Sequence, residues 1–458
     1  MTDRTTDFSV EANSTSFVPL GQRHGRVRDL FTLWFTTNIA PLPIVTGATL
    51  YRSVHLPFWV VMVTIATGHM AGGLVLGACS AQGPQTGLPQ MVQARAQFGR
   101  YGSLLLILVS FLLYLGFFTS NTALAGAALH GLFGGISPGQ GSILAGLCAV
   151  GIGVMGYNTI HLINRLGFWF MATALAAGFV SVMMSGEVPV ITPLAEAPLQ
   201  ASGFISWMLL FSTTCVWNIS YSCYTSDYSR YLPPSVGFKG PFLASAAGAG
   251  CGASLSFIFG VLIAAMMPGV IDPLSAIAGI EQPLGLILMG LFVLNIVSHN
   301  ALNVYGSVLT LITAIQTVFI SWIPGRVARL CFSVIILAGS LSLVTLYPQS
   351  VVPVFLDIVL SLLIVLVPWV TINLCVFYFP RVLREEGSMA TQEVGFDRKI
   401  CLAFLVGTVV QIPFISNAFY TGPMGAYLHG INLGWLIATP VTAGVLFMLH
   451  GRRRSGSS

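Results

Sequence analysis

The sequence predicts an all-α polytopic membrane protein with twelve transmembrane helices. Only 7% of the 458 residues are charged and 55% are hydrophobic, whereas a soluble globular protein carries about 25% charged residues. Twelve apolar runs approach or exceed the roughly 20 residues that a helix needs to cross the hydrocarbon core. The basic residues concentrate in alternate connections between these runs. This composition excludes a soluble enzyme, a disordered protein and a nucleic-acid-binding domain.

The expected spans follow one another along the whole chain. In order they cover residues 29–51, 56–80, 103–133, 139–157, 165–185, 204–226, 241–266, 283–318, 328–347, 351–378, 400–418 and 429–450. We number them 1 to 12 below.

The basic residues predict how the chain is oriented. With a cytoplasmic N-terminus, every Lys and Arg except Arg52 falls in a cytoplasmic segment, as the positive-inside rule requires. An error of one span would invert all later connections, so this distribution supports both the span count and two cytoplasmic termini. We therefore expect a multi-pass protein of the plasma (inner) membrane, with a cytoplasmic tail over residues 1–27 and a basic cytoplasmic tail over 451–458. Residues 1–20 lack the apolar core of a cleavable signal peptide.

Three classes of membrane protein compete, namely a secondary transporter, a channel and a membrane-embedded enzyme. The chain has neither a GxxxxGK[ST] phosphate loop nor an HExxH metal pair. Its eight cysteines show neither paired extracellular spacing nor a CxxC motif. We expect no metal, no cofactor and no enzyme activity. Twelve spans with interrupted helices favour a transporter over a channel, because channels often build a pore from subunits with fewer spans.

Two spans carry the signs of an interrupted helix. Span 1 contains Pro41 and Pro43 directly after the polar run 36–38, and each proline removes an amide donor from the helix. Span 6 lacks proline but contains the polar run 212–222. Broken backbone is tolerated in a membrane only where protein or a water-filled cavity satisfies it. For span 1, a simple proline kink is the alternative.

The two interrupted spans lie five helices apart. A repeat of five helices inverts between its copies because five is odd, and matched broken helices in inverted halves point to a substrate site near the membrane midplane. We therefore expect a first repeat over residues 28–185, a second, inverted repeat over 204–378, and two further transmembrane helices within 400–450.

Two more spans place polar and aromatic side chains at helical spacing. Phe117 and Asn121 lie four residues apart in span 3, and Asn300 and Asn303 lie three apart in span 8, so each pair shares a helix face. Such amides can simply bond to neighbouring helices. They can also recognise the edge of a planar heterocycle, because asparagine offers one acceptor and two donors, while an aromatic ring supplies a stacking face.

Four segments carry a family resemblance. They are LWF at 33–35 with Thr46-Gly47, the loop GPQTGLPQM at 83–91 running on to RAQFGRYG at 95–102, DYSRYLP at 227–233, and NVY at 303–305 with Ser307, joined by PWVTINL at 368–374. With these segments the chain resembles the purine–cytosine permease family of nucleobase–cation symporters, in its cytosine/purine branch. The resemblance covers nearly the whole chain, and the loop at 83–102 is its most specific part.

The resemblance implies a leucine-transporter-type fold, with a five-plus-five inverted repeat and two extra C-terminal helices. It also implies a substrate site on spans 1, 3, 6 and 8. Carried over residue by residue, the substrate-binding positions are Thr37, Asn38, Ile39, Phe117, Asn121, Trp217, Tyr221, Asn300 and Asn303. The family usually has tryptophan where this chain has Phe117 and Tyr221, which leaves the identity of the substrate open.

The coupling ion is expected to be a proton, with sodium as the alternative. Sodium-coupled relatives place neighbouring hydroxyls in span 8, where this chain has Val297 and Ser298 and therefore a single hydroxyl. A hard cation needs about five or six oxygen ligands. A proton needs an ionisable group in the membrane, for which Asp357 is the first choice, followed by His69 and His299.

The loop after span 2 is rich in proline and glycine. It is expected either to act as a cytoplasmic gate packed near the Asp227 segment, or to form a structural elbow whose arginines anchor it to lipid headgroups.

Together these observations predict a secondary active symporter that imports a nucleobase or related heterocycle of the cytosine/purine type with a proton by alternating access. The alternatives are a sodium-coupled transporter of another cyclic amide, such as an allantoin- or hydantoin-like ring, or of a vitamin ring, and more remotely an amino-acid transporter or a channel. The expected partners are the small heterocycle and the lipid bilayer, without nucleic acid. We expect a monomer or a weak homo-oligomer.

Overall fold

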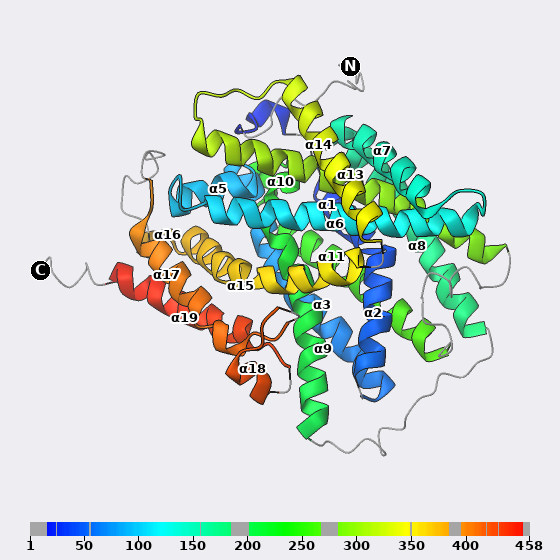
Figure 1. Cartoon of the computed structure of the whole chain (residues 1–458). Coiled ribbons are helices and arrows are strands. Elements are labelled where there is room, and N and C mark those ends of the chain that lie inside the picture. The colour runs from blue at the N-terminus through cyan, green and yellow to red at the C-terminus, as the bar shows by residue number, and fades with distance from the viewer. Residues whose placement is uncertain are drawn as a thin grey trace, which may run out of the picture.

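The computed structural model describes residues 16–23, 25–54, 56–155, 157–184, 201–266, 283–348, 350–383, 395–417, 419–428 and 430–451. Helices form nearly all the regular structure of these residues (Figure 1). A single β-bridge between Ser416 and Thr421 is the one strand-like pairing in the described part of the chain. The all-helical prediction is therefore confirmed for these residues.

The helices of the first predicted repeat begin after a short 3-10 turn, η1 (Leu20–Gln22). They are α1 (Val27–Asn38), α2 (Pro41–Ser53), α3 (Phe58–Ser80), α6 (Leu104–Leu132), α7 (Pro138–Met155) and α8 (Tyr157–Met184). The connection between α3 and α6 contains the short helices α4 (Gly83–Thr86) and α5 (Gln90–Phe98).

The second predicted repeat and the C-terminal part contain the remaining helices. They are α9 (Ala201–Ser220), η2 (Tyr221–Tyr224), α10 (Thr225–Ser229), η3 (Pro234–Val236), α11 (Lys239–Met266), α13 (Leu284–Val318), α14 (Arg326–Leu346), α15 (Val351–Tyr378), α16 (Pro380–Leu383), α17 (Arg398–Val409), η5 (Ile412–Phe414), α18 (Pro423–Tyr427) and α19 (Gly434–Gly451).

Seven helices of the described residues are long and apolar enough to cross a membrane. They cover residues 58–86, 104–132, 138–155, 239–266, 284–318, 326–346 and 351–378. Shorter apolar helical stretches cover 167–181 and 434–450. Span 1 is absent from this set because it is divided into helices of 12 and 13 residues. In span 6, α9 has 20 residues but is too polar to belong to the set.

Two boundaries differ from the predicted spans. Helix α8 begins at Tyr157, so the connection expected at 158–164 is helical. Helix α17 has only 12 residues and ends at Val409, about 18 Å of helix compared with a hydrocarbon core of about 30 Å. Pro413 lies in the 3-10 turn that follows, and a proline cannot continue the hydrogen bonding of a helix interior.

The break between α1 and α2 has a local cause. Ala40 is extended, with φ −142° and ψ 160°, because a residue that precedes a proline is disfavoured in the helical region. Pro41 then begins α2, where its missing amide hydrogen costs nothing. The amide of Ile39 turns back to the carbonyl of Thr36 at 3.1 Å. The carbonyls around residues 36–39 must therefore find partners outside their own helix.

The second break tightens the helix rather than opening it. Helix α9 passes into the 3-10 segment η2 at Tyr221, and the chain resumes as α10 after Tyr224, whose φ is −145° and ψ is 15°. Since 3-10 hydrogen bonding winds the chain more tightly than the α-helix, the side chains of this segment turn to a new face.

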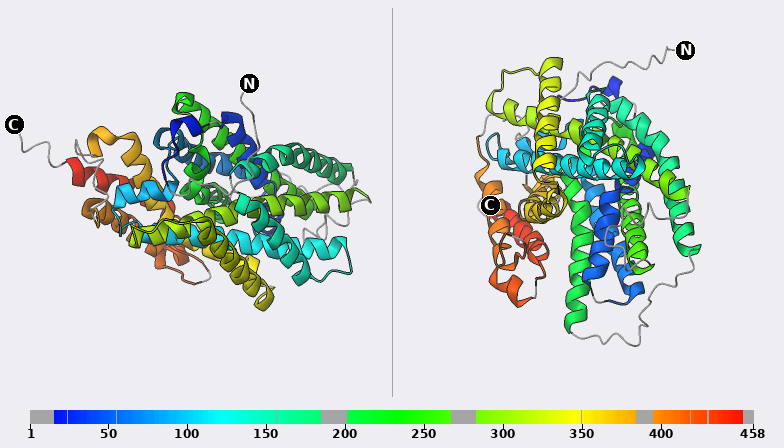
Figure 2. Two further views of the ribbon diagram at one scale, coloured as in Figure 1. Left: turned by 90° about the horizontal axis from the view of Figure 1, so that it is seen from above. Right: turned by 45° about the vertical axis from the view of Figure 1, so that its right-hand side comes forward.

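Three pairs of helices five spans apart pack against each other in the described residues, namely α3 with α11, α6 with α13 and α7 with α14. One group consists of α1, α2 and α3 with α9 and α11, and the other consists of α6 and α7 with α13 and α14. Helices α17 and α19 pack on α15 and lie together at one edge of the molecule in both views of Figure 2. These pairings are what an inverted five-helix repeat requires, while the limits of the two repeats stay a prediction.

Glycines allow the first group to pack closely. A Cβ atom on Gly47 of α2 or on Gly260 of α11 would overlap the backbone of the facing helix, at Phe257 and Ile44 respectively. A Cβ on Gly72 of α3 would overlap the carbonyl of Cys215 in α9. The broken helices are therefore held by backbone-to-backbone contact with their neighbours.

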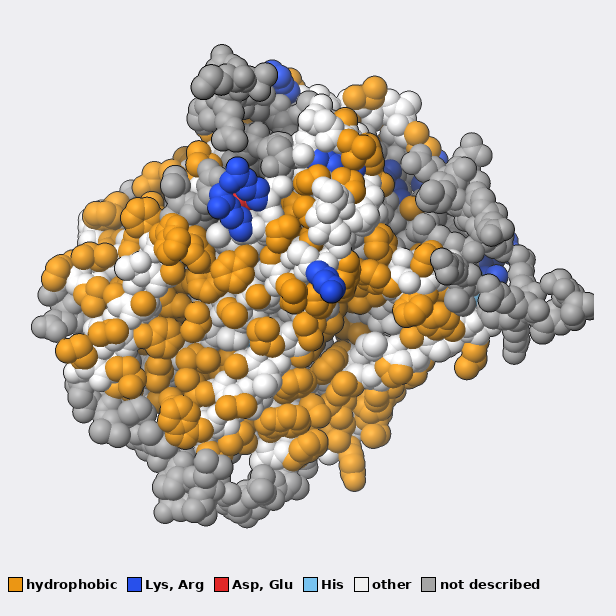
Figure 3. Space-filling view, turned by 180° about the vertical axis from the view of Figure 1, so that it is seen from behind, with side chains coloured by type: hydrophobic (Ala, Val, Ile, Leu, Met, Phe, Trp, Pro, Cys, Tyr) orange, Lys and Arg blue, Asp and Glu red, His pale blue; other side chains and the backbone are white. Residues whose placement is uncertain are grey.

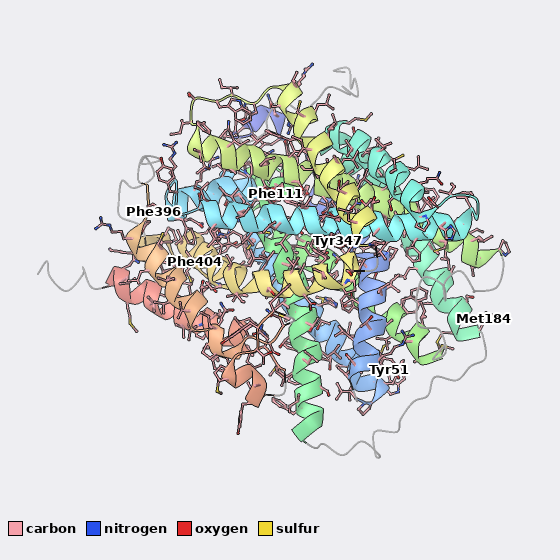
Figure 4. The ribbon with its side chains drawn as sticks, viewed as in Figure 1. Tyr51, Phe111, Met184, Tyr347, Phe396 and Phe404 are labelled. Carbon is pink, nitrogen blue, oxygen red and sulfur yellow. The ribbon has the colours of Figure 1, made fainter. Side chains whose placement is uncertain are left out.

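The outer surface is mostly apolar. Hydrophobic side chains cover much of the face in Figure 3, and its visible Lys and Arg side chains lie in the upper half of that view. Large apolar side chains such as Met184, 80% exposed, and Tyr347, 58% exposed, project from the ends of α8 and α14 (Figure 4). Such a surface suits lipid contact rather than water.

Candidate functional site

A small cavity lies where the end of α1 faces η2. Its volume is about 10 Å³, which accommodates about one water molecule. It is lined by Leu33, Trp34, Thr37, Tyr114, Tyr221, Tyr224, Tyr228, His299, Leu302 and Asn303. None of these described lining residues is Asp, Glu, Lys or Arg, so the cavity suits an uncharged ligand.

Aromatic rings form most of the cavity wall. The rings of Tyr114 and Tyr224 stack with centroids 4.2 Å apart, and the Trp34 ring lies 5.8 Å from that of Tyr221. Behind them, the Phe117 ring stacks on Tyr221 at 5.3 Å and an angle of 20°. A planar ligand held between two rings needs a separation of roughly 7 Å, two contact distances. Ligand entry therefore requires these side chains to move apart.

Several polar groups of the lining lack a partner. The indole nitrogen of Trp34, the hydroxyl of Thr37 and the hydroxyl of Tyr224 are buried without a hydrogen bond among the described residues. A buried polar group without a partner costs about 1–3 kcal/mol. A polar ligand that bonds to them would recover this free energy, so these groups make the cavity the candidate ligand site.

Asn303 offers a further acceptor. The amide nitrogen of Asn300 donates to the carbonyl of Phe118 and to the hydroxyl of Thr122, both at 3.0 Å. Its oxygen accepts from the amide nitrogen of Asn303 at 3.1 Å. Since a carbonyl can only accept, this series of hydrogen bonds fixes the orientation of both side-chain amides. The Asn303 oxygen is thereby left for a ligand donor.

Helix α13 satisfies the carbonyls that the break exposes. The amide nitrogen of Asn295 donates to the carbonyls of Thr36, at 3.2 Å, and Ile39. The Nδ1 atom of His299 lies 2.8 Å from the carbonyl of Thr37. Asn295 and His299 are four residues apart and so share one face of α13. The side chains of Asn295 and His299 thus contact three backbone carbonyl oxygens of the interrupted helix.

A second set of bonds ties the break to α9 and α11. The Asn38 amide donates to the carbonyl of Trp34 at 2.9 Å and accepts from the indole of Trp217 at 3.2 Å. The hydroxyl of Ser256 donates to the Asn38 carbonyl at 2.7 Å. Asn38 and Trp217 therefore position the end of α1 rather than line the cavity.

Sequence comparison identifies the family. A family model described as a permease for cytosine/purines, uracil, thiamine and allantoin matches residues 17–438. The chain belongs to this permease family. The predicted family membership is confirmed, and the chain is a permease rather than an enzyme.

Relatives and solved structures agree with this result. The permease is 28% identical over 449 residues to the putative purine-cytosine permease YxlA of Bacillus subtilis (strain 168), covering 96% of each chain. It is 18% identical to Mhp1, a nucleobase-cation-symport-1 family transporter, in a closed conformation with bromovinylhydantoin bound, with a TM-score of 0.64 over 96% of this chain and 94% of that one. A Na⁺-coupled sialic acid symporter is 14% identical, with a TM-score of 0.63 over 96% and 91%. The structural likeness confirms the predicted leucine-transporter-type fold.

The structure separates the predicted substrate residues of the permease into two groups. Thr37, Tyr221 and Asn303 line the cavity. The others surround it or lie apart from its lining: Asn38, Ile39, Phe117, Asn121, Trp217 and Asn300. Among these, Asn121 is buried and its side-chain oxygen has no hydrogen-bond partner in the described part of the chain.

Sequence reasoning did not select several lining residues. They are Leu33, Trp34, Tyr114, Tyr224, Tyr228 and Leu302. A signal existed for two of them, because Trp34 precedes Thr37 by three residues and Tyr114 precedes Phe117 by three, so each shares a face with a selected residue. Asn295 carried no such signal, since nothing in the sequence places its amide opposite the break.

The predicted coupling groups occupy different places. Asp357 is partly exposed in α15, outside the cavity lining. His69 is fully buried in α3 with its ring 4.4 Å from that of Phe257, and neither ring nitrogen has a hydrogen-bond partner among the described residues. The hydroxyl of Ser298 is likewise buried without a partner in the described part of the chain. Their roles in ion coupling stay predictions.

The loop after α3 packs against α10, next to the cavity. Asp227 accepts hydrogen bonds from the Gln90 amide at 2.8 Å and from the hydroxyl of the lining residue Tyr114 at 3.1 Å. The side-chain oxygen of Gln90 accepts in turn from the amide of Ser226 at 3.2 Å. The predicted contact between the loop after α3 and the Asp227 segment is confirmed, while its action as a gate stays a prediction.

Proposed function

We propose that this permease imports an uncharged planar heterocycle of the cytosine/purine type together with a proton, by alternating access. The observation that carries the proposal is the lining of the cavity at the two helix breaks. It combines aromatic faces with buried polar groups that lack partners, and none of its described members is Asp, Glu, Lys or Arg. A neutral ring that carries both N–H donors and acceptors on its edge would stack on the rings and pair with these groups.

The arrangement of donors and acceptors favours a heterocycle over an amino acid. The oxygen of Asn303 accepts, while the indole of Trp34 donates and the hydroxyl of Thr37 does either. The names of the relatives support the same class, since YxlA is a putative purine-cytosine permease and the Mhp1 structure contains bromovinylhydantoin. A charged amino acid would need partners for its carboxylate and ammonium groups, which this neutral lining does not offer.

The partners of the broken helix support a proton rather than sodium. A sodium ion at the break would use backbone carbonyls as ligands, because hard cations prefer oxygen. Here the carbonyls of Thr36 and Ile39 accept hydrogen bonds from Asn295, and Thr37 contacts His299. A cation would have to displace these donors. Sodium coupling, or transport of an allantoin-like, hydantoin-like or vitamin ring, is the alternative that uptake measurements would reveal.

The closed geometry of the site supports alternating access. A cavity of about 10 Å³ is far smaller than a six-membered ring and is covered on the α10 side by α5 and Gln90. We infer that the ends of α1 and α9 swing away from α6 and α13 to admit the ligand. The distribution of basic residues supports placing both termini in the cytoplasm of a cell whose plasma (inner) membrane holds the permease, as a monomer or weak homo-oligomer.

Uptake by the purified permease in proteoliposomes tests this proposal. Cytosine, adenine, hypoxanthine, uracil, allantoin and a hydantoin are offered separately, with an inward proton gradient in sodium-free buffer or with a sodium gradient at equal pH. We expect accumulation of at least one nucleobase driven by the proton gradient and abolished by a protonophore. Accumulation that requires sodium would contradict the proton, and failure of all six ligands to bind or enter would contradict the substrate class.

A further inference from the structure

The ring of His299 connects the broken helix to the cavity. Its Nδ1 atom lies 2.8 Å from the carbonyl oxygen of Thr37. Because that oxygen can only accept, Nδ1 must carry a hydrogen, and in the neutral ring Nε2 is then the acceptor. His299 also lines the cavity, and Nε2 has no hydrogen-bond partner among the described residues. One nitrogen therefore serves the backbone of α1 while the other is left for the cavity.

The surroundings of His299 contain no competing ionised group in the lining. The other titratable groups that line the cavity with it are Tyr114 of α6, Tyr221 and Tyr224 of η2, and Tyr228 of α10. Tyrosine ordinarily titrates near pH 10, whereas imidazole is the side chain that ordinarily titrates between about pH 5 and 8. Among the described lining residues, His299 is thus the one whose side chain takes up and releases a proton most readily.

Charged groups on the neighbouring helices lie further away. Asp227 of α10 accepts a hydrogen bond from the hydroxyl of the lining residue Tyr114. Arg329 of α14 lies over the ring of Tyr305, and Arg100 donates to the carbonyls of Thr317 and Val318 at the far end of α13. Asp357 of α15 is partly exposed. The side chains of His161 and Arg165 in α8 lie outside the described residues.

We propose that His299 is the binding site of the coupling proton, an inference that rests on the proposed heterocycle symport. The proton adds to Nε2, and both ring nitrogens then donate, Nδ1 to the Thr37 carbonyl and Nε2 to an acceptor atom of the heterocycle. An imidazolium in an aromatic cavity without such an acceptor is poorly solvated. Substrate and proton therefore stabilise each other, and this mutual stabilisation is what symport requires.

The same contacts couple the backbone at the α1 break to the binding of substrate and proton in the cavity. His299 and Asn295, on one face of α13, contact the carbonyls of Thr36, Thr37 and Ile39 at the break. A charged donor forms a stronger hydrogen bond than a neutral one, so protonation tightens the Thr37 contact when the substrate is present. Release of the substrate removes the acceptor at Nε2, and the proton leaves with it.

Replacement of His299 by glutamine separates transport from coupling. Glutamine keeps one donor and one acceptor but cannot be protonated. In His299→Gln we expect accumulation under a one-unit pH gradient to fall from about tenfold to none, while exchange of labelled for unlabelled substrate at equal pH becomes slower but stays measurable. His130→Gln is the matched control, because His130 also contacts a backbone carbonyl, that of Ile136 at 2.7 Å, but lies at an exposed helix end.

Substrate affinity gives a second measurement on the unmodified permease. If substrate binding takes up one proton, affinity rises as pH falls, by up to about tenfold per pH unit. The dependence should vanish in His299→Gln. Undiminished proton-driven accumulation by this variant, a parent affinity independent of pH, or loss of accumulation in Asp357→Asn alone would overturn the inference. Absence of any heterocycle exchange by the parent would instead refute the proposed function.

Discussion

At the scale of single residues, the site depends on how a few amides are oriented. Asn300 bonds to α6 and thereby turns the amide of Asn303, so that one oxygen is left for a ligand. This indirect fixing resembles the outer-shell support that ligand-binding residues commonly need. Asn300 thus acts on the ligand through its neighbour and not by direct contact.

Removal of the Asn303 amide should weaken substrate binding. We expect Asn303→Ala to raise the dissociation constant by roughly 5- to 150-fold, because a lost hydrogen bond to a buried ligand costs about 1–3 kcal/mol. Calorimetry on the purified permease measures this dissociation constant. Asn417→Ala is the control, since Asn417 bonds to Ser361 outside the cavity. Equal affinities of parent and Asn303→Ala would remove Asn303 from the site.

The aromatic wall makes a separate prediction. Loss of the ring in Tyr221→Ala should reduce affinity by about 1–3 kcal/mol, the usual worth of a base stacked on an aromatic side chain. Tyr221→Trp should bind within a few-fold of the parent, because it keeps a stacking face. A ligand titration followed by intrinsic fluorescence compares the two. If Tyr221→Ala and Tyr221→Trp lowered the ligand affinity equally, the size of the side chain would matter at this position and stacking would not.

The sequence revealed the site only in part, for physical reasons. Asn303 could be selected because polar groups are costly inside a membrane, whereas Thr37 and Tyr221 were carried over from the family resemblance. Trp34, Tyr114, Tyr224 and Tyr228 were missed because aromatic residues occur throughout membrane helices and carry no such cost. Asn295 faces the break only because α13 packs against α1, and the two contacting residues are more than 250 positions apart in the sequence. A local sequence pattern cannot indicate such a contact.

At the scale of elements, the breaks in spans 1 and 6 were predictable and the end of α17 was not. Pro41 and the polar run before it predicted the first break from local chemistry. Hydropathy, in contrast, measures how favourably residues partition into lipid, and it does not indicate where a helix ends. The apolar residues around Ile412 and Phe414 therefore extended the predicted span 11 beyond the point where the helix ends.

Close packing of α2 on α11 should be sensitive to a single methyl group. In Gly47→Ala the new Cβ would overlap the backbone of Phe257, so α2 or α11 must shift, at a cost of about 1–3 kcal/mol. We expect a lower thermal unfolding midpoint in detergent. Gly151→Ala in α7 meets no atom within 4 Å and should leave the midpoint unchanged or higher. Equal midpoints for both variants would contradict this account of the helix contact.

At the scale of the whole molecule, the two broken helices meet because α1 packs on α11, α9 packs on α3, and α3 and α11 pack on each other. The group formed by α1, α2, α3, α9 and α11 contains both breaks, while α6 and α13 supply the facing wall. Motion of one group relative to the other would open the cavity without unfolding any helix. The charge distribution along the sequence predicts how this arrangement is oriented, because orientation in a membrane depends on where the basic residues lie.

The central claim is that heterocycle and proton cross the membrane together. Sodium-free proteoliposomes that contain a pH-sensitive dye measure this directly when a transported heterocycle is added outside at equal pH. We expect acidification of the interior that requires both the heterocycle and the permease and is lost in His299→Gln. Heterocycle entry without acidification, or entry only after sodium is added, would contradict it.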